Sequence, residues 1–160
     1  MNQLLLAILL SVLPISELRG GLPLAVHYAM QNELPILPIF LLIVVANAAV
    51  IPVLFLFLDV LHKQCMKIRI YERLFGLYMK SIRRKIERFE HSYSTCGFLA
   101  LAIFVAIPLP ATGAWTGTMI AWALDLDRKR SILAISAGVF VAGLLVLAGS
   151  VGVITLLKLS

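Results

Sequence analysis

Two side chains of opposite charge, Glu17 and Arg19, lie in the stretch PISELRGGLP (Pro14–Pro23), where an apolar segment is interrupted. The run 4–13 before it carries no charge, and the sequence after it is apolar through Met30. An ionisable side chain within an apolar span is costly and is first treated as functional. Arg19 could bind a phosphate or carboxylate group, while Glu17 takes up protons or releases Arg19 in turn. The alternative is a structural pair, or two residues that each satisfy backbone carbonyls at the break.

A second break, PLPATGAWTG (Pro108–Gly117), interrupts another apolar segment and has no charged residue. A helix that starts at such a break offers free N–H groups and a positive dipole end, which suit an anion. We expect Pro23 in the first turn of one such helix and Thr112 as the N-cap of the other. Trp115 and Thr116 either line the resulting pocket or only pack the hairpin. The expected substrate- or proton-binding residues are Glu17, Arg19, Gly20, Gly21, Pro23, Pro108, Pro110, Thr112, Gly113, Trp115 and Thr116.

The composition places these residues in a membrane protein. Hydrophobic residues make up 61% of the 160 residues, and the mean hydropathy is +1.01. We therefore expect a single all-α polytopic membrane domain. The sequence has no Cys/His cluster with metal-ligand spacing and no nucleophile–base arrangement near either break. No catalytic residue, metal, cofactor or nucleic-acid partner is expected, and Cys65 and Cys96 are expected to be reduced thiols.

Each half of the chain has a broken apolar segment followed by one long span. The boundaries are 1–61 for the first half (hairpin 2–31, span 34–61) and 97–160 for the second (hairpin 97–126, span 131–157). Each arm of a broken segment is about 10–13 residues, or ~15–20 Å, which reaches only partway across a ~30 Å hydrocarbon core. Such a segment is either a kinked full span or a re-entrant hairpin. The small residues Ala134, Gly138 and Ala142 would allow close helix packing in the second span, within one chain or between copies in a homodimer.

The basic residues favour re-entrant hairpins. Nine of the fourteen Lys and Arg residues lie between His62 and Tyr93, and Arg128–Arg130 forms a second cluster. Re-entrant hairpins would put both clusters on one face, which the positive-inside rule makes the cytoplasmic face of the cell membrane. Residues 62–96 would then form a basic amphipathic linker helix on that face, orienting the halves or recruiting anionic lipid head groups.

A shift of 93 residues lays the first half on the second. It puts Gly20 on Gly113, the first break on the second, and 34–61 on 127–154. The first hairpin would enter from outside and the second from the cytoplasm, so the halves would have opposite orientations. This pattern is typical of secondary transporters with inverted-topology repeats and discontinuous helices.

Two motifs, ISELRGGLPLAV (Ile15–Val26) and IPLPATGAWTGT (Ile107–Thr118), resemble those of the small multi-drug export protein family. That family is similar, more distantly, to the DedA/VTT (SNARE-associated Golgi protein) superfamily. The superfamily resemblance implies two opposed re-entrant hairpins and translocation of lipids, with Glu17 and Arg19 as the charged residues of the first hairpin. Two features depart from it: Ala111 stands where the nearer family usually has glycine, and the second break has no charge.

Three functions follow as hypotheses. The first is a transporter or flippase for an amphiphilic, anionic substrate such as a lipid phosphate, with proton coupling through Glu17. The second is a proton-coupled exporter of small toxic compounds, in which Glu17 neutralises a cation and Trp115 stacks on it. The third is an assembly factor that transports nothing. Under all three, membrane lipids surround the protein, and His27, Asn47 and Asp59 are expected to make local hydrogen bonds or interface contacts.

Overall fold

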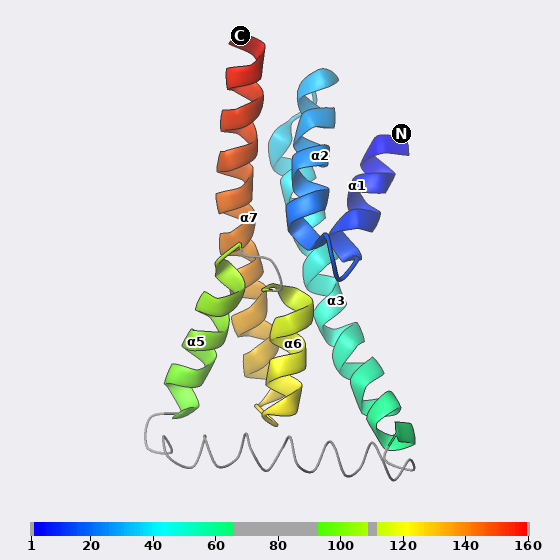
Figure 1. Cartoon of the computed structure of the whole chain (residues 1–160), viewed down its shortest axis with the longest axis vertical. Helices are drawn as coiled ribbons and strands as arrows, with labels where there is room; N and C mark the ends of the chain where they lie inside the picture. Colours follow the sequence, from blue (N-terminus) through cyan, green and yellow to red (C-terminus); the bar gives the residue numbers. More distant parts are fainter. Residues whose placement is uncertain (1, 66–92, 109–111, 160) are drawn as a thin grey trace.

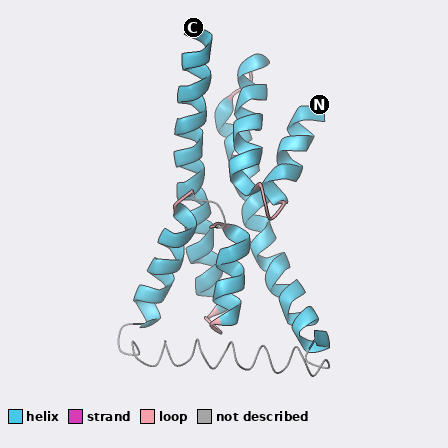
Figure 2. Cartoon of the chain, viewed as in Figure 1, coloured by secondary structure: helices cyan, strands magenta, loops and turns pink. Residues whose placement is uncertain are grey.

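The computed structural model describes residues 2–65, 93–108 and 112–159. Within these ranges the chain is helical and forms no strand (Figure 2). The helices are α1 (Asn2–Val12), α2 (Glu17–Gln31), α3 (Ile36–Cys65), α5 (Tyr93–Ala106), α6 (Ala114–Ala123) and α7 (Arg128–Leu159) (Figure 1). The predicted amphipathic linker falls mainly on 66–92 and lies outside the described residues.

Helices α3 and α7 run the length of the molecule in opposite directions (Figure 1). Both are long and apolar enough to cross a membrane, over Ile36–Val60 (25 residues) and Arg128–Thr155 (28 residues). The prediction of two long apolar helices is confirmed. Pro52 lies inside α3 and leaves one carbonyl of the preceding turn without its helical N–H partner, but it does not end the helix.

The four shorter helices form two pairs at opposite ends of the molecule. Helices α1 and α2 lie in one half and α5 and α6 in the other, and the α1–α2 turn meets the start of α6 near mid-length (Figure 1). Helix α1 has 11 residues and α6 has 10. At 1.5 Å per residue each is about 15 Å long, roughly half the thickness of a hydrocarbon core.

Glycines set the closest helix contacts. A Cβ on Gly21 would lie 2.8 Å from the Ser11 Cβ and closer still to the Ala7 carbonyl, so α2 and α1 approach at backbone distance. A Cβ on Gly138 would lie 2.6 Å from the Ala102 carbonyl, which brings α7 equally close to α5. Gly138, the middle residue of the small-residue ladder on α7, therefore packs against α5 of the same chain, as small residues allow in lipid.

The core runs along the contact between α2, α3 and α7. Leu22, Phe40, Ile43 and Ile135 are fully or almost fully buried in it. The outer faces of the long helices carry large apolar side chains that are more than half exposed, among them Leu37, Val45, Val53, Leu56 and Leu133. An apolar outer surface of this kind suits a hydrocarbon surrounding.

The helix starts differ from two of the predictions. Helix α2 begins at Glu17, so Pro23 lies in its interior and not in its first turn, and Gly20 and Gly21 are helical. The chain reverses earlier, at Leu13–Ser16, and Glu17 itself has a positive φ of 44°. Neighbouring helices pack against α2, and it stays continuous past its glycines and proline. Local propensity alone would have stopped the helix there.

The expected N-cap of the second helix is also wrong. Gly113 holds the N-cap position of α6, and Thr112 makes no capping hydrogen bond. The Thr112 Oγ1 donates instead to the Ile107 carbonyl (2.7 Å), back across the break. This bond satisfies a carbonyl at the end of α5, where lipid would offer no donor.

Candidate functional site at the meeting of the two hairpins

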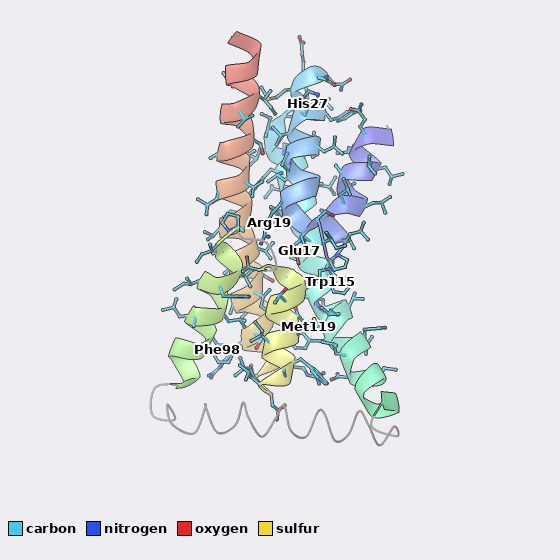
Figure 3. The ribbon with its side chains drawn as sticks, in the orientation of Figure 1. Glu17, Arg19, His27, Phe98, Trp115 and Met119 are labelled. Atoms are coloured by element: carbon cyan, nitrogen blue, oxygen red, sulfur yellow. The ribbon has the colours of Figure 1, made fainter. Side chains whose placement is uncertain are left out.

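The charged side chains of the first hairpin bond to the backbone of the second. Glu17 is the first residue of α2 and is only 7% exposed. Its Oε1 accepts a hydrogen bond from the Trp115 backbone N–H in the first turn of α6 (3.2 Å). Arg19 donates to the Thr112 Oγ1 (2.8 Å) and to the Thr112 carbonyl. Figure 3 shows Glu17, Arg19 and Trp115 together near mid-length.

The Glu17 carboxylate occupies the position expected for a bound anion. The free N–H groups and the positive dipole end of a helix N-terminus both favour a negative charge. In this structure the negative group at the start of α6 comes from the protein itself. A ligand anion would have to replace that carboxylate.

Gly113 makes this approach geometrically feasible. Its φ of 150° and ψ of −164° lie in a region that is essentially restricted to glycine. A Cβ at this position would also lie 2.6 Å from the Glu17 Cδ and closer still to one carboxylate oxygen. Backbone conformation and space therefore both require glycine beside Glu17.

Glu17 and Arg19 do not form a salt bridge with each other. In the described part of the chain, the ion pair within 4.0 Å is the one between Arg128 and Asp59 (2.6 Å). Glu17 and Arg19 each bond across the gap to the other hairpin. The predicted alternative of backbone satisfaction fits Arg19, which bonds the Thr112 carbonyl, whereas Glu17 accepts from an N–H group.

A small cavity lies between the two tips. Its volume is about 10 Å³, close to the space of one water molecule. The polar groups on its wall are Glu17, Arg19 and Asn47, and the rest of the wall is apolar. A buried water typically needs two to four hydrogen-bond partners, and these three side chains can supply them.

The end of α1 is satisfied by side chains from three different segments. The Leu10 carbonyl accepts from the Ser16 hydroxyl (2.6 Å), the Ser11 carbonyl from Asn47 Nδ2 (2.6 Å), and the Val12 carbonyl from Trp115 Nε1 (2.9 Å). The last carbonyls of a helix have no intrahelical partner, and lipid cannot supply one. These bonds allow α1 to end in the middle of an apolar molecule.

Comparison with known protein families gave one result that bears on this site. A family model described as "Putative small multi-drug export protein" matches residues 17–145. The chain belongs to this family. The match begins at Glu17 and includes every residue that lines the small cavity, from Glu17 to Ala142. The comparisons with curated proteins and with solved structures gave no match.

The family's description names export and no enzymatic activity, and together with α3 and α7 it indicates a membrane protein. The described residues hold no group of three or more His, Cys, Asp or Glu side chains that could bind a metal. The resemblance to the DedA/VTT superfamily stays a prediction.

One residue of the site, Asn47, was not predicted from the sequence. Asn47 is 1% exposed in the middle of α3, lines the cavity and holds the α1–α2 turn. It was expected to make local hydrogen bonds or interface contacts. Its bond to the Ser11 carbonyl is an interface contact between α3 and α1, but its place beside Glu17 and Arg19 was not expected. The available signal was a lone amide in a 25-residue apolar span.

Several predicted residues lie away from the cavity. Gly20 and Gly21 face Ser16 and α1, Pro108 is exposed, and Thr116 does not line the cavity. His27 is exposed towards the far end of α2 (Figure 3). Pro110 lies outside the described residues, as do the side chains of both cysteines. Asp59 accepts from Trp122 Nε1 (3.1 Å) and pairs with Arg128, so it makes interface contacts, one of the two roles expected for it.

Proposed function

We propose that this protein is a proton-linked membrane exporter of small amphiphilic compounds, with its site where two re-entrant hairpins meet. In this proposal α3 and α7 cross the membrane, while α1–α2 and α5–α6 enter from opposite sides. The observation that carries it is the buried Glu17 carboxylate, which belongs to one hairpin and is bonded to the helix start of the other.

The helix boundaries support an inverted repeat. Adding 93 to the bounds of α3 (Ile36–Cys65) gives 129–158, and α7 is Arg128–Leu159. Arg19 and Thr112 are 93 positions apart and bond to each other. A two-fold axis brings equivalent residues together where it passes through a molecule, so this bond fits an axis between the two tips.

Membrane orientation follows the basic residues. The start of α7 carries Arg128–Arg130 and lies at the same end of the molecule as the end of α3 (Figure 1). Under the positive-inside rule that end, together with the basic segment 62–93, faces the cytoplasm of a plasma-membrane protein. The α1–α2 hairpin then enters from outside and α5–α6 from the cytoplasm.

Proton exchange at Glu17 would drive the cycle. The ionised carboxylate is held by the Trp115 N–H and the dipole of α6, and protonation removes the charge on which both interactions depend. A protonated Glu17 therefore holds the tips less tightly, whereas an ionised Glu17 that has left α6 can bind a cation. One proton and one cationic substrate would alternate at the same carboxylate.

A second candidate is a flippase for an amphiphilic anion such as a lipid phosphate. Arg19 supports it, because a guanidinium beside backbone donors at a helix start is a common phosphate site. In this mechanism the substrate anion would take the place of Glu17 at α6, and Arg19 would leave Thr112 to bind it. The two candidates thus assign the substrate to different side chains.

Flux measurements in liposomes separate the candidates. Purified protein is reconstituted with an inward proton gradient, and efflux of a cationic dye and movement of a fluorescent lipid phosphate are followed for wild type, Glu17→Gln, Arg19→Ala and the exposed control Glu33→Gln. Dye flux that needs Glu17 and not Arg19 supports the exporter. Lipid movement that needs both supports the flippase. If the correctly folded wild-type protein shows no flux of either compound, both transport functions are contradicted and the assembly-factor hypothesis is favoured.

A further inference from the structure

An apolar groove of about 400 Å³ lies on the other side of the wall from the polar cavity. Its floor is the stretch of α3 from Ala46 to Phe57, and Val12 of α1 and Trp115 of α6 close it. Its volume falls within the range of pockets that hold small organic ligands, about 300–1,000 Å³. Its lining side chains are all apolar or aromatic.

Neighbouring residues divide between the groove and the cavity. On α3, Ala46 faces the groove while Asn47 faces the cavity. On α6, Trp115 faces the groove while Ala114 faces the cavity. The two spaces are therefore separated by the thickness of a helix face, at the level where the tips meet.

Trp115 takes part in both spaces. Its indole ring lines the groove and its Nε1 donates to the Val12 carbonyl at the end of α1 (2.9 Å). Its backbone N–H donates to Glu17 in the cavity (3.2 Å). Any displacement of the indole by a ligand in the groove would strain both bonds, which are the links between α6 and the first hairpin on this side.

We propose that this groove binds the apolar, aromatic body of the exported compound, and that Trp115 is the positioning residue that couples binding there to release of Glu17. This inference rests on the proposed export function. It commits to one class of occupant, a lipophilic aromatic cation. Such a compound would place its rings between Trp115 and Phe57 and its charge at the Trp115 end of the groove. Glu17 lies behind Trp115 and would reach that charge once it is released from α6.

The charge is needed because apolar burial alone gives no selectivity here. A groove open to lipid exchanges one apolar contact for another, since acyl chains are as apolar as its walls. Preference for a solute must come from its interaction with the aromatic rings and with a carboxylate in a low-dielectric setting. Acyl chains, which have no cationic group beside Glu17, gain neither.

The test uses tetraphenylphosphonium, a permanent lipophilic cation, binding in radiolabelled form to the protein in nanodiscs. Val53→Phe fills the groove, and Val45→Phe is its matched control: both valines lie on α3 and are 66% and 63% exposed, but only Val53 lines the groove. We expect Val53→Phe to weaken binding at least tenfold and Val45→Phe to change it less than twofold. Equal effects of the two substitutions would overturn the proposal.

Two further measurements separate occupants and roles. The chain has two tryptophans, so Trp122→Phe leaves Trp115 as the single tryptophan, whose emission can be excited selectively. Tetraphenylphosphonium should quench it, and should relieve quenching by lipids with brominated acyl chains. If tetraphenylphosphonium does not relieve quenching by the brominated lipids, a lipid occupies the groove. If dimerisation of the protein abolishes that quenching, a second copy occupies it. Either result overturns the proposal.

Trp115→Phe keeps an aromatic ring but loses the Nε1–H group. We expect the affinity for tetraphenylphosphonium to stay within threefold, while the maximal rate of its export falls at least fivefold. A merely structural role would lower folded yield and alter both values together. Binding that depends on Val53 without any flux would contradict the export function and leave the groove intact, whereas flux insensitive to Val53→Phe would contradict only the groove.

Discussion

Both hairpin tips lie near mid-length of the molecule (Figure 1), but they supply different chemistry. The first tip carries both charges, and the carbonyls at the end of α1 accept hydrogen bonds from the side chains of Ser16, Asn47 and Trp115. The second has no charge and offers the N–H groups at the start of α6, with Thr112 as the acceptor for Arg19. Each tip thus lacks what the other provides, and a site forms only when the two are in contact.

The two hairpins are also held differently. Helix α1 packs mainly on its own partner α2, through Gly21, whereas α5 packs mainly on α7, through Gly138, and touches α6 much less. Helix α6 is therefore free of its own hairpin partner along most of its length and is held by α3, α7 and the first tip. We expect the motion that opens the site to move α6 relative to a more rigid α1–α2 pair.

The largest expected effect of a substitution at the tips is that of Gly113→Ala. The backbone conformation alone should cost about 1–3 kcal/mol, and the new methyl group would also displace the Glu17 carboxylate. We expect a large fall in the unfolding temperature of the purified protein and loss of flux. Gly149→Ala is the control, because its Cβ would meet nothing within 4 Å. Equal stability of the two variants would show that the tips do not meet as described.

Glu17→Gln comes next and tests which tip carries the exchangeable charge. The amide oxygen can still accept from Trp115, so the fold should be kept, while the proton-binding group is lost. We expect proton-driven flux to fall at least tenfold with a small change in unfolding temperature. Flux that keeps its dependence on the proton gradient would place coupling elsewhere.

Arg19→Lys tests the link from the first tip to Thr112. A guanidinium can bond the hydroxyl and the carbonyl together, whereas an ammonium is a compact point charge without the planar fork. We expect a loss of about 1 kcal/mol in stability, with dye flux near the wild-type value under the exporter and lipid-phosphate movement several-fold lower under the flippase. If Lys and Ala at this position are equivalent to wild type in both measurements, the Arg19–Thr112 contact has no role.

Thr112→Val tests the same link from the uncharged tip. It removes one acceptor for Arg19 and the donor to the Ile107 carbonyl, but leaves the Thr112 carbonyl in place. A destabilisation of about 1 kcal/mol is expected, measured by unfolding in mixed detergent. Thr155→Val is the matched control, since the Thr155 hydroxyl bonds only within its own exposed turn of α7.

The smallest effect should come from Asp59→Asn, far from both tips. This change breaks the ion pair with Arg128, whose side chain is 57% exposed. Exposed ion pairs contribute about 0–1 kcal/mol and weaken as salt is added. We expect a fall in unfolding temperature that is small, shrinks at high salt and leaves flux unchanged. A loss of flux as large as that of Glu17→Gln would contradict the placement of the transport site at the hairpin tips.

The sequence by itself determined the two long apolar helices and the two breaks. It also determined that one break carries charged residues and the other does not. These features are local, since hydropathy, proline, glycine and charge act on the chain within a few residues. The 93-residue shift was also visible in the positions of the two breaks and of the long apolar runs that follow them. Under this shift the bounds of α3 fall within one residue of those of α7, and Arg19 falls on Thr112, to which it bonds.

Only the tertiary structure decided which groups bond. Glu17 and Arg19 are two residues apart, yet each bonds to residues more than 90 positions away. Helix α2 continues through Gly20, Gly21 and Pro23 because α1, α3 and α7 pack around it, which propensity cannot indicate. Asn47 lies at the site because its amide donates to the Ser11 carbonyl at the end of α1, where lipid offers no donor.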